Sequence, residues 1–209
     1  MRVKTEATRQ AIIDAAIAVF RDKGYDRASM AEISARIGGS KATLYGYFTS
    51  KEALYAAAML KATEAQRHYV LTRLAPAGAD LATGLEAFGK ALLALLTAPE
   101  VLAMIRTAMS EGTASTLGPA LYAAGPRAMW TEVATMLAGF MASGALRHAD
   151  PDLAALHFKG LLEAGIFEPA LYGAPAYLGN DLATRLAVDT FLRAYAPPAA
   201  PAPPEASQN

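Results

Sequence analysis

The chain has 209 residues, of which 54% are hydrophobic and 18% are charged, and its formal net charge is zero. This length and apolar content suit a globular protein made of one large domain, or of a small domain joined to a larger one. The absence of cysteine excludes disulfides, a thiolate nucleophile and a cysteine-based metal site. We therefore expect packing to provide the stability of the fold.

The charges are unevenly distributed along the chain. Residues 1–67 contain 11 Lys and Arg against 7 Asp and Glu, giving +4, and residues 68–209 contain 8 against 12, giving −4. A basic first third indicates an anionic partner for this part of the protein. The excess is small, so the interpretation needs a motif to support it.

The N-terminal residues do not read as an export signal. Charged residues, among them Arg2, Lys4, Glu6 and Arg9, interrupt any apolar segment there. The longest strongly apolar stretch, 133–146, is shorter than the roughly 20 residues that cross a bilayer. We expect a cytoplasmic protein without a membrane partner.

The composition predicts an all-α fold. Ala, Leu, Met, Glu, Lys and Arg favour helices, and alternating runs rich in Val, Ile and Thr are absent. The first helix is predicted from Thr5 to about Lys23, with Gly24 as its C-terminal cap. A capping box at Ser29 and Glu32, in which each residue bonds to the backbone N–H of the other, opens a short second helix.

A third short helix follows a glycine turn. Gly38 and Gly39 end the second helix, and Ser40 can cap a third over 41–48. A further capping box over 49–52 opens a long fourth helix to about Ala75. Two short helices joined by a tight glycine turn form a helix-turn-helix unit.

Longer apolar helices are predicted in the rest of the chain. Their ranges are about 79–97, 99–111, 116–143 with a break at 125–126, 151–172 and 179–195. The prolines at 99 and 151 suit first turns. We expect a DNA-binding domain over 1–55, a helical effector-binding and dimerisation domain over 56–196, and a disordered Pro- and Ala-rich tail over 197–209.

The third predicted helix carries side chains that the core does not need. Leu44 and Phe48 are four residues apart and face inward. The remaining side chains are expected to face outward and are Lys41, Ala42, Thr43, Tyr45 and Tyr47. Small residues let such a helix approach base edges, while lysine and tyrosine side chains can donate hydrogen bonds to phosphates or bases. Lys51, in the first turn of the fourth helix, adds a charge for a phosphate.

These residues form part of a recognisable pattern. TLYGYFTSKEALY at 43–55, with AEISARIGGSKA at 31–42 and IIDAAIAVFRDKGYDRAS at 12–29, resembles the DNA-binding domain of the TetR family of bacterial transcriptional regulators. The resemblance covers residues 9–55. It implies a DNA-binding set made of Ser29, Lys41, Ala42, Thr43, Tyr45, Tyr47 and Lys51. Ser29 has the alternative role of a helix cap alone.

The chain departs from the family pattern at three positions. Gly39 stands where the family usually has an apolar residue, Ala42 replaces a common glycine, and Gly46 lies in the middle of the recognition helix. Glycine inside a helix costs about 1 kcal/mol relative to alanine. We therefore predict a recognition helix that is looser than average without DNA.

The second half resembles the ligand-binding and dimerisation domain of the same family. FGKALLALLTAPEVLAMIR and LYAAGPRAMW resemble the subgroup typified by the regulator AefR. The resemblance implies that the last two helices pair with those of a second copy, through Leu156, Leu161, Leu162, Leu182, Leu186 and Phe191. A twofold homodimer implies a near-palindromic double-stranded DNA operator.

Candidate effector-binding residues are aromatic residues and methionines, which form adaptable apolar walls. They are Phe88, Met104, Tyr122, Trp130, Met136 and Phe140, and the alternative role for each is ordinary core packing. The three histidines, His68, His148 and His157, lack the spacing of metal ligands and pair with no evident nucleophile. We expect no cofactor, metal or catalytic site.

The sequence thus predicts a DNA-binding transcriptional regulator that is not an enzyme. We expect a repressor that leaves its operator when a small apolar effector binds the larger domain. One alternative is a helical enzyme with a nonfunctional N-terminal unit, but the sequence contains no evident catalytic group to support it. The other is an architectural DNA-binding protein without an effector, which sequence specificity would distinguish.

Overall fold

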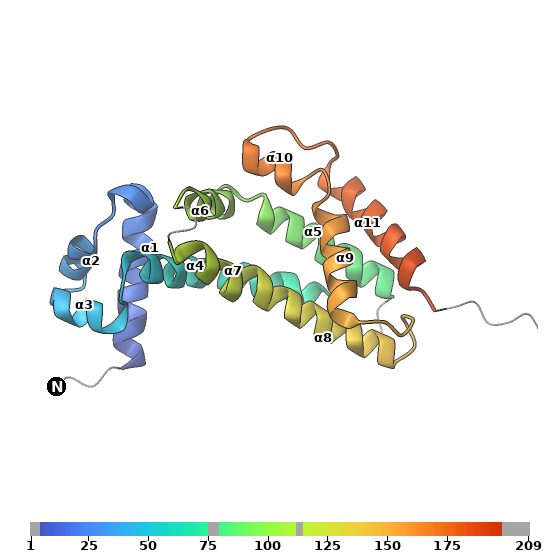
Figure 1. The fold of residues 1–209 in the computed structure, drawn as a ribbon, viewed down its shortest axis with the longest axis horizontal. Helices are drawn as coiled ribbons and strands as arrows, with labels where there is room; N and C mark the ends of the chain where they lie inside the picture. Colours follow the sequence, from blue (N-terminus) through green and yellow to red (C-terminus); the bar gives the residue numbers. More distant parts are fainter. Residues whose placement is uncertain (1–4, 75–79, 112–114, 198–209) are drawn as a thin grey trace, which may run out of the picture.

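The computed structural model describes residues 5–74, 80–111 and 115–197, and all regular elements in these ranges are helices. Three helices form one end of the molecule: α1 (Glu6–Arg27), α2 (Met30–Arg36) and α3 (Lys41–Tyr47) (Figure 1). The long α4 (Lys51–Leu74) leads from them into the larger half. The predicted all-α fold is confirmed.

The first helix bends at Gly24 and continues. Gly24 has φ 76° and ψ 173°, a conformation that side-chain-bearing residues avoid, and one more turn follows as far as Arg27. The predicted end at Lys23 therefore coincides with a kink. At the N-terminus, the Thr5 hydroxyl accepts a hydrogen bond from the backbone N–H of Thr8, as a helix cap does.

Local caps fix the starts of the next helices. Ser29 accepts a hydrogen bond from the N–H of Glu32 at 3.2 Å, but the Glu32 carboxylate forms an ion pair with Lys23 at 2.5 Å instead of returning to Ser29. Only half of the predicted capping box is therefore present. Ser40 caps α3 as predicted, through the N–H of Thr43 at 3.1 Å.

The start of α4 is capped one residue later than predicted. The hydroxyl of Ser50 accepts a hydrogen bond from the N–H of Ala53 at 3.1 Å. The helix then contributes to two large hydrophobic cores. Leu54 and Ala58 lie in the first core, which α4 shares with α1–α3, and Val70 and Leu74 lie in the second core, in the larger half of the molecule. The domain boundary predicted at 55 falls inside this continuous helix.

The larger half contains the remaining helices. They are α5 (Leu81–Leu96), α6 (Pro99–Ser110), α7 (Leu117–Tyr122), the π-helical turn η1 (Ala123–Arg127), α8 (Ala128–Ala142), α9 (Pro151–Glu163), α10 (Phe167–Tyr172) and α11 (Asn180–Tyr195). In Figure 1 α9 and α11 lie far from α1–α3, with α5 and α8 between. The second core joins α4, α5, α8, α9 and α11.

Two predictions about these helices were wrong. No break occurs at 125–126, because a π-helical turn containing Pro126 joins α7 to α8. The wider hydrogen-bonding pattern of this turn accommodates a proline, which has no backbone N–H to donate. The single helix expected over 151–172 is two helices, α9 and α10. Gly165 between them has φ 72°, and its carbonyl accepts a hydrogen bond from the N–H of Tyr177.

Close packing at Gly89 brings α5 against α9 and α11. A Cβ atom at this position would lie 2.7 Å from Cδ2 of Leu162 and 2.8 Å from Cγ2 of Thr184. Both neighbours are fully buried. The absence of a side chain at residue 89 therefore sets the distance between these helices.

Among the described helices, none is by itself long and apolar enough to cross a membrane. Helices α5 and α6 pass that test of length and composition only when taken together, and they meet at a bend of 61°. The tail predicted over 197–209 lies, beyond Pro197, outside the described residues.

Candidate DNA-binding surface and effector cavity

The recognition helix α3 has the inward face that the sequence predicts. Leu44 is fully buried and Phe48, which follows the last helical residue, is 5% exposed. Lys41, Ala42 and Tyr45 are exposed, and Tyr45 retains 49% of its surface. The outer face of α3 therefore presents a lysine, a small residue and a tyrosine side by side.

Thr43 and Tyr47 are less exposed than expected. Thr43 is half-buried and its hydroxyl lies 2.9 Å from that of Ser40. Tyr47 packs against the first core, and its hydroxyl accepts a hydrogen bond from the N–H of Thr5 at 2.8 Å. The expectation that Tyr47 points away from the core was wrong, because residues 44 and 47 are three apart and share a helix face.

Lys51 lies over the last turn of α1. Its Nζ is 4.2 Å from the centroid of the Tyr25 ring and donates a hydrogen bond to the carbonyl of Asp26 at 3.3 Å. The predicted phosphate contact would therefore need this ammonium group to turn or to share its donors. Ser29, at the start of α2, is exposed and caps that helix.

A buried tyrosine fixes the start of α4 against α1. The hydroxyl of Tyr25 donates a hydrogen bond to Oε1 of Glu52 at 3.2 Å. Burial raises the pKa of Tyr25 well above its ordinary value, and the carboxylates of Glu52 and Glu111 raise it further. The pKa of Glu52 is lowered, first by a hydrogen bond from the Ser50 hydroxyl.

A cavity of about 400 Å³ lies between α4, α5 and α6. Its walls are mostly apolar, and the residues that line it are Met59, Ala62, Thr63, Gln66, Tyr69, Val70, Ala91, Ala94, Leu95, Ala98, Glu100, Val101 and Met104. This volume is within the range of small-molecule sites in proteins. The signal in the sequence is a set of alanines, at 91 and 94 on α5 and at 98 just before α6, whose small side chains leave space.

Of the predicted effector-binding residues, Met104 lines this cavity and the others lie elsewhere. Phe88 and Trp130 pack edge-to-face in the second core, with ring centroids 5.9 Å apart. Met136 and Phe140 pack against the same core, and Tyr122 is 59% exposed. The spacing of large apolar residues marks a buried face and does not distinguish core from cavity, so a role of these five in effector binding stays a prediction.

A second hollow, of about 390 Å³, lies between α4 and α8 and is lined by polar side chains. Arg67 and Glu132 form an ion pair across it at 3.4 Å, and Glu64 and His68 also line it. Within residues 5–74, 80–111 and 115–197 no group of three or more potential metal ligands is found.

The cavity between α4, α5 and α6 and the helices α1–α3 share structural parts. Met104 lines the cavity and also packs against the first core, which includes Leu117 and Leu121 of α7. Tyr55 on α4 is part of that core, and Ala108 on α6 packs against it. A displacement of α6 would therefore act directly on residues that support α1–α3.

An apolar face is exposed on α9 and α11. Leu156, Leu182 and Leu186 retain 53%, 41% and 50% of their surfaces. Leu161 is half-buried, whereas Leu162 and Phe191 are fully enclosed in the core of the protomer. The expected interface role of these last two was wrong, because they lie on the inward stripes of their helices.

Two family profiles match this chain. The profile of the C-terminal domain of AefR-like transcriptional repressors matches residues 83–197, and that of the bacterial regulatory proteins of the tetR family matches residues 12–58. The chain belongs to the TetR family. Its C-terminal domain is of the AefR-like type, so the expected family, subgroup and role as a DNA-binding transcriptional regulator are confirmed.

Solved structures of TetR-family proteins are similar over most of the chain. A TetR-family transcriptional regulator from Mesorhizobium loti is 28% identical, with a TM-score of 0.76, covering 92% of this chain and 100% of that one. The flavonoid-responsive regulator FrrA is also 28% identical, with a TM-score of 0.71, covering 93% and 100%. Regulators of the TetR family are generally not enzymes.

A further relative matches over a quarter of the chain. The A-factor receptor protein of Streptomyces griseus is 48% identical over 52 residues. The match covers 25% of this chain and 19% of the receptor, so the chain spans about a fifth of that relative. TetR-family regulators bind DNA and small-molecule effectors and act as dimers.

Proposed function

We propose that this TetR-family regulator is a repressor that binds a near-palindromic operator as a homodimer and leaves it when a small molecule occupies the cavity between α4, α5 and α6. The observation that carries the proposal is the outer face of α3, where Lys41, Ala42 and Tyr45 are exposed together on a helix buried through Leu44. Such a face can enter a major groove, with Ala42 at the closest approach. The repressor acts where its operator is, in the cytoplasm.

The dimer would form through α9 and α11. Leu153, Leu156, Leu182 and Leu186 are large apolar side chains that each expose 41% or more of their surface. Burying them against the same helices of a second copy removes this apolar area from water. The two copies of α3 would then contact half-sites about one DNA turn apart.

Release would follow from a population shift. A ligand in the cavity contacts α4 and α6, and both helices touch the core that supports α3, through Tyr55 and Met104. We expect the ligand to bind best to a dimer whose recognition helices are wrongly spaced for the two half-sites. Ligand binding and DNA binding then weaken each other by one shared coupling free energy. The similarity to FrrA, which is flavonoid-responsive, supports a small-molecule effector.

Footprinting on the DNA upstream of the gene tests the proposal. We expect two protected half-sites related by a twofold axis and separated by about one turn. Lys41→Ala should remove the protection, whereas Lys90→Ala, on α5 and paired with Asp181, should preserve it. Uniform protection without preferred sites would instead indicate an architectural DNA-binding protein.

A further inference from the structure

The cavity between α4, α5 and α6 contains one charged group. Among the described residues that line it, Glu100 alone is charged, and it is exposed in the first turn of α6. Its carboxylate forms no hydrogen bond or ion pair with another described residue. A ligand in the cavity therefore meets an apolar wall with one unpaired negative charge at its edge.

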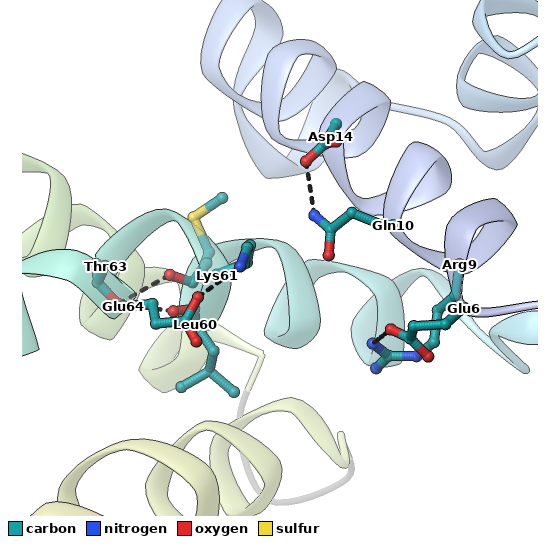
Figure 2. Close-up of polar contacts among 9 residues, drawn as sticks. Glu6, Arg9, Gln10, Asp14, Leu60, Lys61, Thr63 and Glu64 are labelled. Atoms are coloured by element: carbon teal, nitrogen blue, oxygen red, sulfur yellow. Dashed lines mark hydrogen bonds and ion pairs between the residues drawn. The ribbon is translucent and has the colours of Figure 1, made fainter. Parts of the chain in front are cut away.

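The other polar lining groups do not offset this charge. The hydroxyl of Thr63 donates to the carbonyl of Met59 at 2.9 Å and lies near that of Leu60, so it is directed along its own helix (Figure 2). Gln66 is neutral, and Tyr69 is 52% exposed. The remaining walls are alanines, methionines and other aliphatic residues.

Nearby cationic side chains are engaged with other groups. Lys61 pairs with Glu64 at 2.6 Å (Figure 2), and the guanidinium of Arg73 lies 4.0 Å from the ring centroid of Tyr69. Arg106 donates hydrogen bonds to the carbonyls of residues 170 and 171 at the end of α10. None of these three lines the cavity. A carboxylate ligand would thus find no cationic side chain there and would be repelled by Glu100, whose charge also offsets the positive end of the α6 dipole.

We propose that the cavity selects an apolar amine, whose hydrocarbon part lies among the alanines and methionines and whose ammonium group pairs with Glu100. This inference rests on the proposed function, in which the same cavity holds the effector. A charge-assisted hydrogen bond to a carboxylate is stronger than a neutral one. Because Glu100 is at a solvent-exposed edge, screening limits the gain to about tenfold in affinity.

Calorimetry with three matched ligands tests the inference on the full chain without DNA. The probes are decylamine, decanol and decanoate, which all have a ten-carbon chain. Decylamine is protonated at neutral pH, decanol is neutral and decanoate is an anion. We expect decylamine to bind about tenfold more tightly than decanol, and decanoate to bind most weakly. Glu100→Gln should remove the preference for the amine, and Glu86→Gln, on α5 but outside the cavity, should leave it unchanged.

A cavity-filling variant shows where the amine binds. Ala94 is exposed on the lining face of α5, so Ala94→Phe should fold normally and lose decylamine binding. Equal binding of amine and alcohol, tighter binding of decanoate, no binding of any probe, or a preference that survives Glu100→Gln would overturn the inference.

Operator release is measured separately by the anisotropy of labelled DNA. Amine binding that depends on Glu100 but leaves the affinity for DNA unchanged would support the ligand class and refute the effector role of the cavity. Operator release by a ligand that does not compete with decylamine, and that still acts on the Ala94→Phe variant, would support repression and refute the amine site.

Discussion

Replacing Gly89 with alanine tests the packing of α5 against the two helices proposed to form the dimer. The new Cβ would lie 2.7 Å from Cδ2 of Leu162 and 2.8 Å from Cγ2 of Thr184. Carbon atoms pack best at about 3.5–4.0 Å, so the neighbours must move by roughly 0.8 Å. Both side chains are fully buried, on two different helices.

The expected cost is the difference between two effects. Overpacking a filled core costs about 1–3 kcal/mol, and two simultaneous close contacts place Gly89→Ala in the upper part of this range, at about 2–3 kcal/mol. Alanine inside a helix gains about 1 kcal/mol over glycine. We expect Gly89→Ala to lower the free energy of unfolding by about 1–2 kcal/mol, which corresponds to a fall in Tm of roughly 2–8 °C for a protein of this size.

Urea unfolding followed by Trp130 fluorescence measures this effect. Trp130 is the one tryptophan of the chain and packs against Phe88, the residue before Gly89, so it reports the same core. Gly46→Ala is the matched control, because no atom lies within 4 Å of its added Cβ, and circular dichroism should show a gain of about 1 kcal/mol. A Gly89→Ala variant as stable as the unmodified protein would refute the close approach of α5 to α9 and α11.

Three further predictions concern stability and motion. Thr184→Val should raise the free energy of unfolding by about 1 kcal/mol in urea titrations, because the buried Thr184 hydroxyl has no hydrogen-bond partner among the described residues. A lower free energy of unfolding would contradict this and indicate that the hydroxyl is hydrogen-bonded. The raised pKa of Tyr25 means that the unfolded chain ionises first, so stability should fall as the pH rises above about 10, and thermal melts of Tyr25→Phe should show a smaller fall. In hydrogen exchange without DNA, the amides of 41–48 should exchange faster than those of 12–20, since Gly46 weakens α3; equal protection would contradict this.

Local signals explain why the DNA-binding helices could be predicted from the sequence. Ser40 caps α3 and Leu44 anchors it, and both effects act within one helical turn. The same reasoning misjudged Tyr47, which lies three residues from Leu44 on the same helix face and whose hydroxyl is reached by the N–H of Thr5, 42 residues away. Periodicity identifies a stripe, and contacts with distant segments decide how far its flanks are covered.

The cavity and the dimer face were harder to predict. Phe88 was predicted for the effector site and Phe191 for the interface, and both are buried in the protomer. Helical spacing does not determine whether an apolar face meets a core, a ligand or a second copy. The sequence reading overlooked the small residues that mark the cavity, since the alanines at 91, 94 and 98 leave space between α4, α5 and α6. Leu156 and Leu186 were predicted for the interface and remain exposed in the protomer.

Competitive DNA binding tests the central claim that the outer face of α3 reads an operator. The purified protein is titrated against labelled upstream DNA, with random DNA of equal length as competitor, across a range of salt concentrations. We predict a preference of roughly a thousandfold or more, and a slope of log K against log salt near −7 for about eight phosphate contacts per dimer. Tyr45→Phe should weaken the binding without changing Tm. Equal affinity for upstream and random DNA, or specific binding that survives both Lys41→Ala and Tyr45→Phe, would contradict the claim.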